Sequence, residues 1–161
     1  MTFEYKNILA AVDGSNEAKR AFETSVGIAK RNNAILNLIY VVDTRSYTAM
    51  TKRVPSIDDR VFAHGRELLD NYKKEAQAAG LPEVNIIVAP GSPHKVISRE
   101  YAKRVNADLI VCGAQGMNAV EHFLMGSVSE HIVRSSPCDV LVVRRSESEK
   151  AEDQQRADLK K

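Results

Sequence analysis

The chain has 161 residues, of which 43% are hydrophobic and 27% are charged, and its formal net charge is +2. A chain of this length fits one domain, and this composition is ordinary for a soluble globular protein. The nearly balanced charge argues against nucleic acid or an acidic membrane as a partner, and the sequence has neither a basic cluster nor an aromatic RNA-binding motif.

Five short apolar runs alternate with amphipathic helical patterns. The runs, each predicted to be a strand, are Asn7 to Val12, Ile35 to Val42, Val84 to Ala89, Asp108 to Cys112 and Asp139 to Val143. The first, fourth and fifth are nearly continuous in Ile, Leu, Val and Ala, which is typical of strands covered on both faces.

Four helices are predicted between these strands. The first ends at Asn32-Asn33, which tolerate a left-handed turn, and the second ends at Gly80-Leu81-Pro82. The third begins near Pro93, and the fourth begins after Gly126, where Ser127-Val128-Ser129-Glu130 resembles a capping box. The residues expected to face the core are Ala18, Phe22, Val26 and Ala29, then Val61, Leu68, Tyr72, Ala76 and Ala79, then Val96, Ile97, Tyr101 and Val105, and finally Val128, Ile132 and Val133.

This alternation predicts an α/β fold, a doubly wound parallel sheet with helices on both faces and right-handed crossovers. Two segments lie outside the pattern. Thr44 to Asp59 is a long polar connection, and Ser146 to Lys161 mixes both charges, so it forms either a frayed helix or a disordered tail. We therefore expect one domain over residues 1–145 and a charged C-terminal tail over 146–161.

The location is expected to be cytoplasmic. The first residues lack the apolar stretch of a secretory signal, and no apolar run reaches the roughly 18 residues of a membrane-spanning helix. Cys112 and Cys138 have neither CxxC nor metal-ligand spacing, and reduced, buried thiols are the favoured interpretation.

The most informative stretch follows the fourth predicted strand. Glycines stand at 113, 116 and 126, and Ser127 begins a helix. In open α/β sheets ligands bind beyond the carboxyl ends of the strands, where glycines let the backbone approach an anion and a helix start adds N–H donors. Taken singly, each glycine is explained as well by a turn, and Ser127 by a helix cap.

Other phosphate-binding signatures are missing. The sequence has no GxxxxGK[ST] motif, and Asp13-Gly14-Ser15 stands where a GxGxxG motif would follow the first strand. The glycine loop contains no lysine or arginine. Phosphate charge would have to be met by backbone dipoles, hydroxyls and a divalent cation.

Three segments together resemble the ATP-binding universal stress proteins, over roughly residues 4 to 144. Gly113-x2-Gly116-x9-Gly126-Ser127, followed by Val128, is similar to that family's nucleotide loop. Ala10-Ala11-Val12-Asp13-Gly14-Ser15 resembles its opening, and Ser136-Pro137-Cys138-Asp139-Val140-Leu141-Val142-Val143-Arg144 resembles its last strand. The resemblance implies a five-stranded sheet of order 3-2-1-4-5, Rossmann-like and of the adenine nucleotide alpha hydrolase-like type. It also implies ATP across the ends of strands one and four.

The resemblance also implies residue roles. Asp13 would lie by the ribose or metal, Val41 would meet the adenine, and Gly126, Ser127 and Ser129 would hold the phosphates. Mg²⁺ would be held mainly by the phosphates, with Asp13 as a candidate ligand, although Asp-Gly is also a common turn. The residues predicted to bind the nucleotide are Ala11, Val12, Asp13, Val41, Gly113, Gln115, Gly116, Gly126, Ser127, Val128 and Ser129. Gln115 departs from the many relatives with a basic residue or histidine there.

No catalytic constellation is evident. The histidines at 64, 94, 122 and 131 lack HExxH spacing and are expected on the surface or as satisfied core residues, and no GxSxG elbow occurs. Gly91-Ser92-Pro93 is interpreted as a turn and helix start.

Val140 to Val143 is expected to be an exposed edge strand. The resemblance implies a homodimer formed by antiparallel pairing of this strand, and the alternative is that the C-terminal tail covers it.

The leading functional hypothesis is a regulatory or stress-response module that changes its protein partner interactions with ATP occupancy. A second is slow ATP hydrolysis or phosphoryl transfer, for which Asp13 and Gln115 are the only candidate residues nearby. A third is a dimeric adaptor that binds no nucleotide.

Overall fold

A computed structural model describes residues 3–46, 55–115 and 125–161. Its five-stranded sheet has the order β3-β2-β1-β4-β5, and every neighbouring pair is parallel, as the resemblance implied. The strands are β1 (Asn7–Ala11), β2 (Ile35–Asp43), β3 (Val84–Gly91), β4 (Leu109–Gly113) and β5 (Asp139–Val143). β2 and β3 run beyond their predicted ends because Val42 pairs with Pro90 and Asp43 with Gly91.

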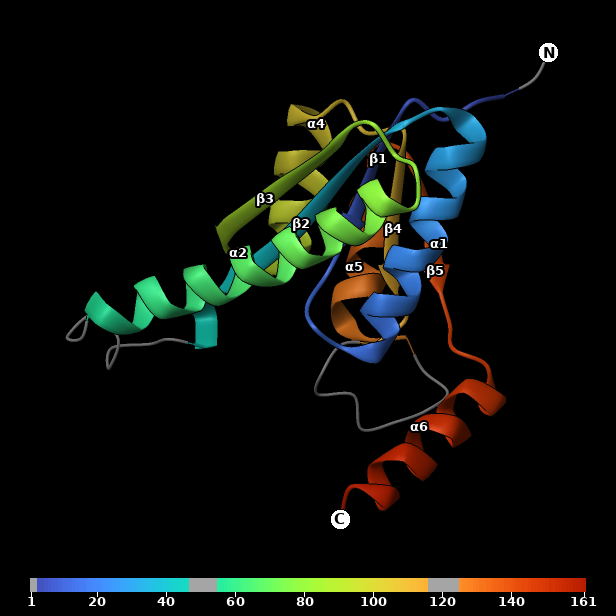
Figure 1. Ribbon diagram of the computed structural model, residues 1–161. Coiled ribbons are helices and arrows are strands. Elements are labelled where there is room, and N and C mark those ends of the chain that lie inside the picture. Colours follow the sequence, from blue (N-terminus) through green and yellow to red (C-terminus); the bar gives the residue numbers. More distant parts are fainter. Residues whose placement is uncertain (1–2, 47–54, 116–124) are drawn as a thin grey trace.

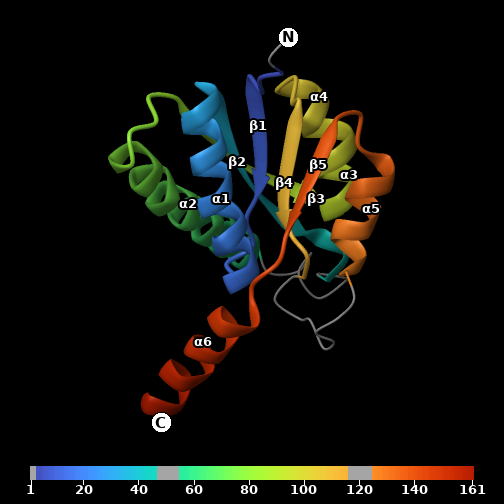
Figure 2. The same ribbon diagram turned by 90° about the vertical axis from the view of Figure 1, so that its right-hand side faces the viewer.

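Helices cover both faces of the sheet, as predicted (Figure 1). They are α1 (Asn16–Asn32), α2 (Pro55–Ala78), α3 (Pro93–Lys95), η3 (Val96–Tyr101), α4 (Ala102–Arg104), α5 (Ser127–Ser135) and α6 (Glu147–Leu159), with a single turn, η1 (Thr44–Ser46), after β2. Figure 2 shows α1 and α2 on one face and α3, α4 and α5 on the other. Each face has its own apolar cluster, and Ile8, Leu9 and Ile110 are fully buried. Among the helices within the described ranges, none combines the length and apolar character needed to cross a bilayer.

The first helix follows its prediction. The Ser15 side chain accepts a hydrogen bond from the Ala18 N–H at the start of α1. Asn33 caps the other end at φ 53°, in the left-handed region that asparagine tolerates. Phe22 and Ala29 are buried as expected, so local sequence and core packing agree here.

The second helix differs from the prediction. It begins at Pro55, so the connection after β2 is shorter than Thr44 to Asp59. Leu69 is fully buried and Leu68 only partly, while Ala79 lies beyond the helix end and is exposed. Tyr72 and Ala76 are buried as predicted. At Gly65, also buried, an added Cβ would lie 2.5 Å from Tyr40 Cδ1, so α2 approaches the sheet closely at this residue.

The helix after Pro93 starts where predicted, with Val96 and Ile97 buried. Its middle segment, η3, has π-helical hydrogen bonding, a form common near functional sites.

The helix after Gly126 differs from its prediction in two respects. Gly126 is the N-cap of α5 and no side chain caps it, so the predicted capping box is wrong. Val133 is 48% exposed rather than inward-facing, because the neighbouring Ile132 takes the core position.

The C-terminal tail forms a helix. Ser146 and Glu149 make a capping box at the start of α6, and Glu149 pairs with Arg20 of α1 at 3.1 Å. α6 has no buried residue, and Figures 1 and 2 both show it extending away from the sheet beyond the carboxyl ends of the strands. It therefore does not cover the edge of β5, contrary to the alternative considered above.

Candidate functional site

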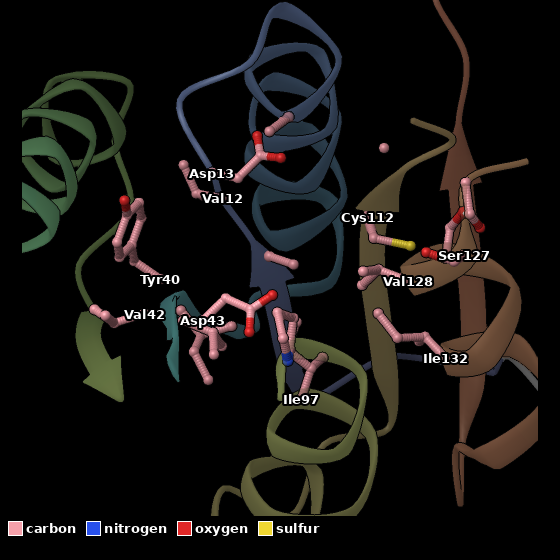
Figure 3. Close-up of a pocket in the computed structure, with 18 of the residues that line it drawn as sticks. Val12, Asp13, Tyr40, Val42, Asp43, Ile97, Cys112, Ser127, Val128 and Ile132 are labelled. Carbon is pink, nitrogen blue, oxygen red and sulfur yellow. The ribbon is translucent and has the colours of Figure 1, made fainter. Parts of the chain in front are cut away.

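A cavity of about 590 Å³ lies at the carboxyl ends of β1, β2 and β4, beside the start of α5. Figure 3 shows its side chains converging from these elements and from the helix after β3. Of the predicted nucleotide-binding residues, the structure gathers these around the cavity: Ala11, Val12, Asp13, Val41, Gly113, Gln115, Gly126, Ser127, Val128 and Ser129. Gly116 lies outside the described residues. The roles of all these residues remain predictions.

One wall of the cavity is apolar. Val12, Ile97 and Ile132 are buried and Val41 is partly buried. Tyr40 also lines the wall, and its ring packs against α2 at Gly65. Such a surface can pack against the flat face of an aromatic heterocycle.

Asp13 stands where β1 gives way to α1. Its Oδ1 accepts a hydrogen bond of 2.9 Å from the Ser15 N–H, across Gly14 at φ 85°. This is the Asp-Gly turn that the sequence allowed. Asp13 Oδ2 has no hydrogen bond within the described part of the chain, and Asp13 is one of the residues that line the cavity.

The start of α5 forms the opposite wall. α1 and α6 are each capped by a serine side chain, whereas α5 has only Gly126 at its N-cap position. Its first N–H groups are therefore free of a side-chain cap, and they carry the partial positive charge of a helix N-terminus. These donors lie beside Ser127 and Val128 on the cavity lining, where an anion could accept from them.

The room for a side chain differs between the two described glycines of the loop. A Cβ on Gly113 would lie 3.0 Å from Glu17 Cβ and 3.1 Å from its carbonyl carbon, so packing of α1 against β4 already requires a glycine. Gly126 has an ordinary φ of −65°, and its Cβ would come no closer than 3.4 Å to Ala114 O. Among the described residues, neither backbone strain nor packing requires glycine at 126.

The two predicted serines lie differently. Ser127 is exposed at the helix tip, and its backbone carbonyl oxygen lies 2.6 Å from His131 Nδ1. Ser129 is buried, and its hydroxyl is within donating distance of Ala114 O at 2.8 Å and Gly126 O at 2.9 Å. Since a serine hydroxyl has one proton, Ser129 has none left for a phosphate oxygen.

Charged residues that the sequence analysis missed also line the cavity. Arg45 makes a two-pronged contact with Asp43, with Nε to Oδ1 at 2.9 Å and Nη2 to Oδ2 at 2.8 Å. These hydrogen bonds hold the pKa of Asp43 below its ordinary value. Nothing in the sequence pattern marked them, because η1 is what turns Arg45 back onto Asp43.

The rings of His94 and His131 lie 4.5 Å apart and join α3 to α5. Partial burial lowers the pKa of His94, and neighbouring His131 and Arg45 add to the effect, so the neutral form is favoured. Burial raises the pKa of Cys112 to about 12, which makes it a neutral, unreactive thiol, in line with the prediction for this cysteine.

The residues fit an adenine nucleotide better than a protein-held metal ion. No group of three or more His, Cys, Asp or Glu side chains within the described ranges could hold a metal. Mg²⁺ is commonly bound through one or two carboxylates plus substrate phosphates, and Asp13 offers one such oxygen. An apolar wall facing an uncapped helix start suits a ligand with a flat apolar end and an anionic end.

Comparisons with known proteins agree with this arrangement. The sequence model of the universal stress protein family matches residues 4–144. A protein of Staphylococcus aureus (strain USA300) named for that family is 48% identical over 143 residues, 89% of this chain and 86% of its own. The structure of universal stress protein UspA from Lactobacillus plantarum matches with a TM-score of 0.81 and 33% identity, covering 89% of this chain and 100% of that one. A universal stress protein in complex with cAMP matches with a TM-score of 0.67 and 27% identity, with the same coverages.

Proposed function

Because the chain belongs to the universal stress protein family, we propose that it is a regulatory module that binds ATP in the cavity at the carboxyl ends of β1, β2 and β4. The observation that carries the proposal is the start of α5. There Gly126 supplies no side-chain cap for the helix N–H groups, at a position where neither strain nor packing against the described residues requires glycine.

The two walls of the cavity suggest how the ligand lies. The adenine packs on the apolar side, with Val41 among its contacts, and the ribose lies near Asp13 and Gly113. The phosphates accept from the N–H groups at the start of α5 and from the Ser127 hydroxyl. Micromolar affinity corresponds to about 8 kcal/mol, and hydrogen bonds to charged groups contribute roughly 1.5–3 kcal/mol each. A few such bonds with adenine burial reach that range after ordering costs.

Mg²⁺ is expected to accompany the nucleotide, held mainly by the phosphates. When bound, it would neutralise part of the phosphate charge. The Asp13 carboxylate is the candidate protein ligand, through the oxygen that its turn leaves available.

The relative in complex with cAMP supports an adenine nucleotide as the ligand class. It also sets the decisive comparison, because cAMP and ATP share the adenosine but differ in their phosphates.

Calorimetric titration with Mg-ATP, cAMP and Mg-GTP tests the proposal. We expect Mg-ATP to bind with a dissociation constant in the micromolar range and to raise the unfolding temperature, as ligand linkage requires. Mg-GTP is expected to bind more weakly, because a different base meets the apolar wall. If Mg-ATP gives neither heat nor a shift in unfolding temperature, the chain is better described as an adaptor without nucleotide.

We also propose that two copies pair through β5. This edge strand keeps Val140, Leu141 and Val142 only partly buried, and α6 extends away from it. An apolar edge with unpaired backbone groups is a template for pairing with another chain. Antiparallel pairing about Leu141, the middle residue of β5, would cover it.

Leu141→Lys is expected to raise the dimer dissociation constant by at least about tenfold, because like charges opposite one another destabilise a strand pair. The lysine stem can still lie over the apolar cluster, so the monomer should fold. Sedimentation equilibrium measures the effect, with Leu141→Met as the matched apolar control. A parent protein that is monomeric at high concentration would contradict the dimer, as would a Leu141→Lys variant that dimerises equally well.

A further inference from the structure

A second, smaller hollow of about 180 Å³ lies next to the first. Gln115, two residues after the end of β4, lines both of them, so the two hollows meet there. The rest of the second hollow comes from the start of α1 and from the chain between β5 and α6. Its lining residues are Glu17, Ala114, Gln115, Arg144, Arg145, Glu147 and Lys150.

The lining of this hollow is cationic. Three of its side chains are positive and two are carboxylates. Lys150 lies 3.1 Å from Glu147, and Arg145 lies 3.9 Å from Glu17. Arg144 is exposed and has no ion pair or hydrogen bond within the part of the chain that the structure describes. Among the described residues, its charge is therefore not held in an ion pair.

The position of these cations is built into the fold. The Arg145 side chain is only 12% exposed, and its guanidinium donates to Glu149 O at 3.0 Å and pairs with Asp153. The Arg145 N–H also donates to Glu17 Oε2 at 3.3 Å. With the Arg20–Glu149 pair, these contacts hold the first turns of α6 against α1. Lys150, on that first part of α6, is thereby placed beside the end of β4.

We propose that this hollow is an anion subsite that receives the terminal phosphate of a nucleotide bound in the larger cavity, with Arg144 and Lys150 supplying the positive charge. The inference rests on the proposed function and adds a determinant of ligand choice to it. The first cavity offers phosphates backbone donors but no unpaired cationic side chain among its described residues, since its Arg45 is held by Asp43. In the second hollow Lys150 pairs with Glu147, so Arg144 is its cation without a described ion pair and Lys150 adds to the charge from within its pair. Lys150 lies beyond the residues that the family description matches.

The subsite predicts a specific preference. AMP and cAMP carry no terminal phosphate that could reach past Gln115, so they gain nothing from Arg144 and Lys150. ATP gains a charge-assisted contact, and because the two cations are partly exposed, that gain should weaken as salt is added.

The test is a double variant, Arg144→Ala with Lys150→Ala, titrated with Mg-ATP and with AMP. We expect the ATP dissociation constant to rise about three- to tenfold while that of AMP is unchanged. Arg156→Ala is the matched control, because it removes a cation of α6 that does not line the hollow. Thermal unfolding checks that each variant is folded.

The outcomes separate the two proposals. If the parent protein binds neither ATP nor AMP, the proposed function fails. If the parent binds both and the double variant leaves the ratio of their affinities unchanged, the subsite is wrong. The last measurement is the thermal stability of the parent and of the double variant in the presence of inorganic phosphate. If it stabilises the parent but not the double variant while the ATP-to-AMP ratio stays constant, the hollow binds free anions and the terminal-phosphate assignment is overturned.

Discussion

Gly126→Val is expected to lower the affinity for Mg-ATP by about 100-fold, which corresponds to about 3 kcal/mol. The branched side chain would stand at the N-cap of α5, beside the N–H groups assigned to the phosphates. Two charge-assisted hydrogen bonds lost together account for a change of this size. Calorimetric titration of parent and variant measures it directly.

Folding should survive this substitution. The φ of Gly126 is −65°, and a Cβ there would meet Ala114 O at 3.4 Å, which is ordinary contact. Gly126→Ala should therefore fold normally and lose affinity less than the valine variant. Gly27→Ala is the matched control, since Gly27 lies in α1 away from the cavity and its Cβ would meet only the end of the Arg31 side chain. A folded Gly126→Val protein that binds ATP like the parent would show that the loop has been assigned wrongly.

The elements that the sequence predicts well are those whose signals are local. The strand cores and α1 follow from apolar runs, the helical pattern of Ala18, Phe22, Val26 and Ala29, and the turn at Asn32-Asn33. The sheet order followed from the family resemblance, since alternation alone does not specify which strands are neighbours. The cavity lining was also predictable from the family resemblance. Its place agrees with the general rule that the strand ends of a parallel sheet meet at one edge.

The features that escaped prediction depend on contacts between distant segments. The close approach of α2 to the sheet at Gly65, where an added Cβ would lie 2.5 Å from the Tyr40 ring, cannot be read from helical periodicity. The position of α6 depends on Arg145 reaching Glu17 and Asp153. A cap motif was also misread, because Ser127-Val128-Ser129-Glu130 fits the pattern of a capping box while Gly126 takes the cap position.

Ser129→Ala is expected to lower the free energy of unfolding by about 0.5–1.5 kcal/mol. The buried Ser129 hydroxyl lies within hydrogen-bond distance of the carbonyl oxygens of Ala114 and Gly126. The Gly126 N–H also donates to Ala114 O at 2.7 Å, so the hydroxyl reinforces an existing contact. Without it, both carbonyl oxygens keep a backbone donor, the Gly126 N–H for Ala114 O and the Glu130 N–H for Gly126 O, but the start of α5 is held less firmly. Denaturant unfolding measures the loss.

Ser127→Ala separates this structural role from phosphate binding. Ser127 is exposed at the tip of α5 and its hydroxyl has no hydrogen bond to the rest of the described chain, so its loss should leave stability nearly unchanged. It should weaken ATP binding, because a hydroxyl donor to phosphate is removed. The two variants are therefore expected to show opposite patterns, with stability lost at Ser129 and affinity lost at Ser127. If Ser129→Ala instead weakens ATP binding as much as Ser127→Ala and leaves unfolding unchanged, its proton serves the phosphate rather than the two carbonyls.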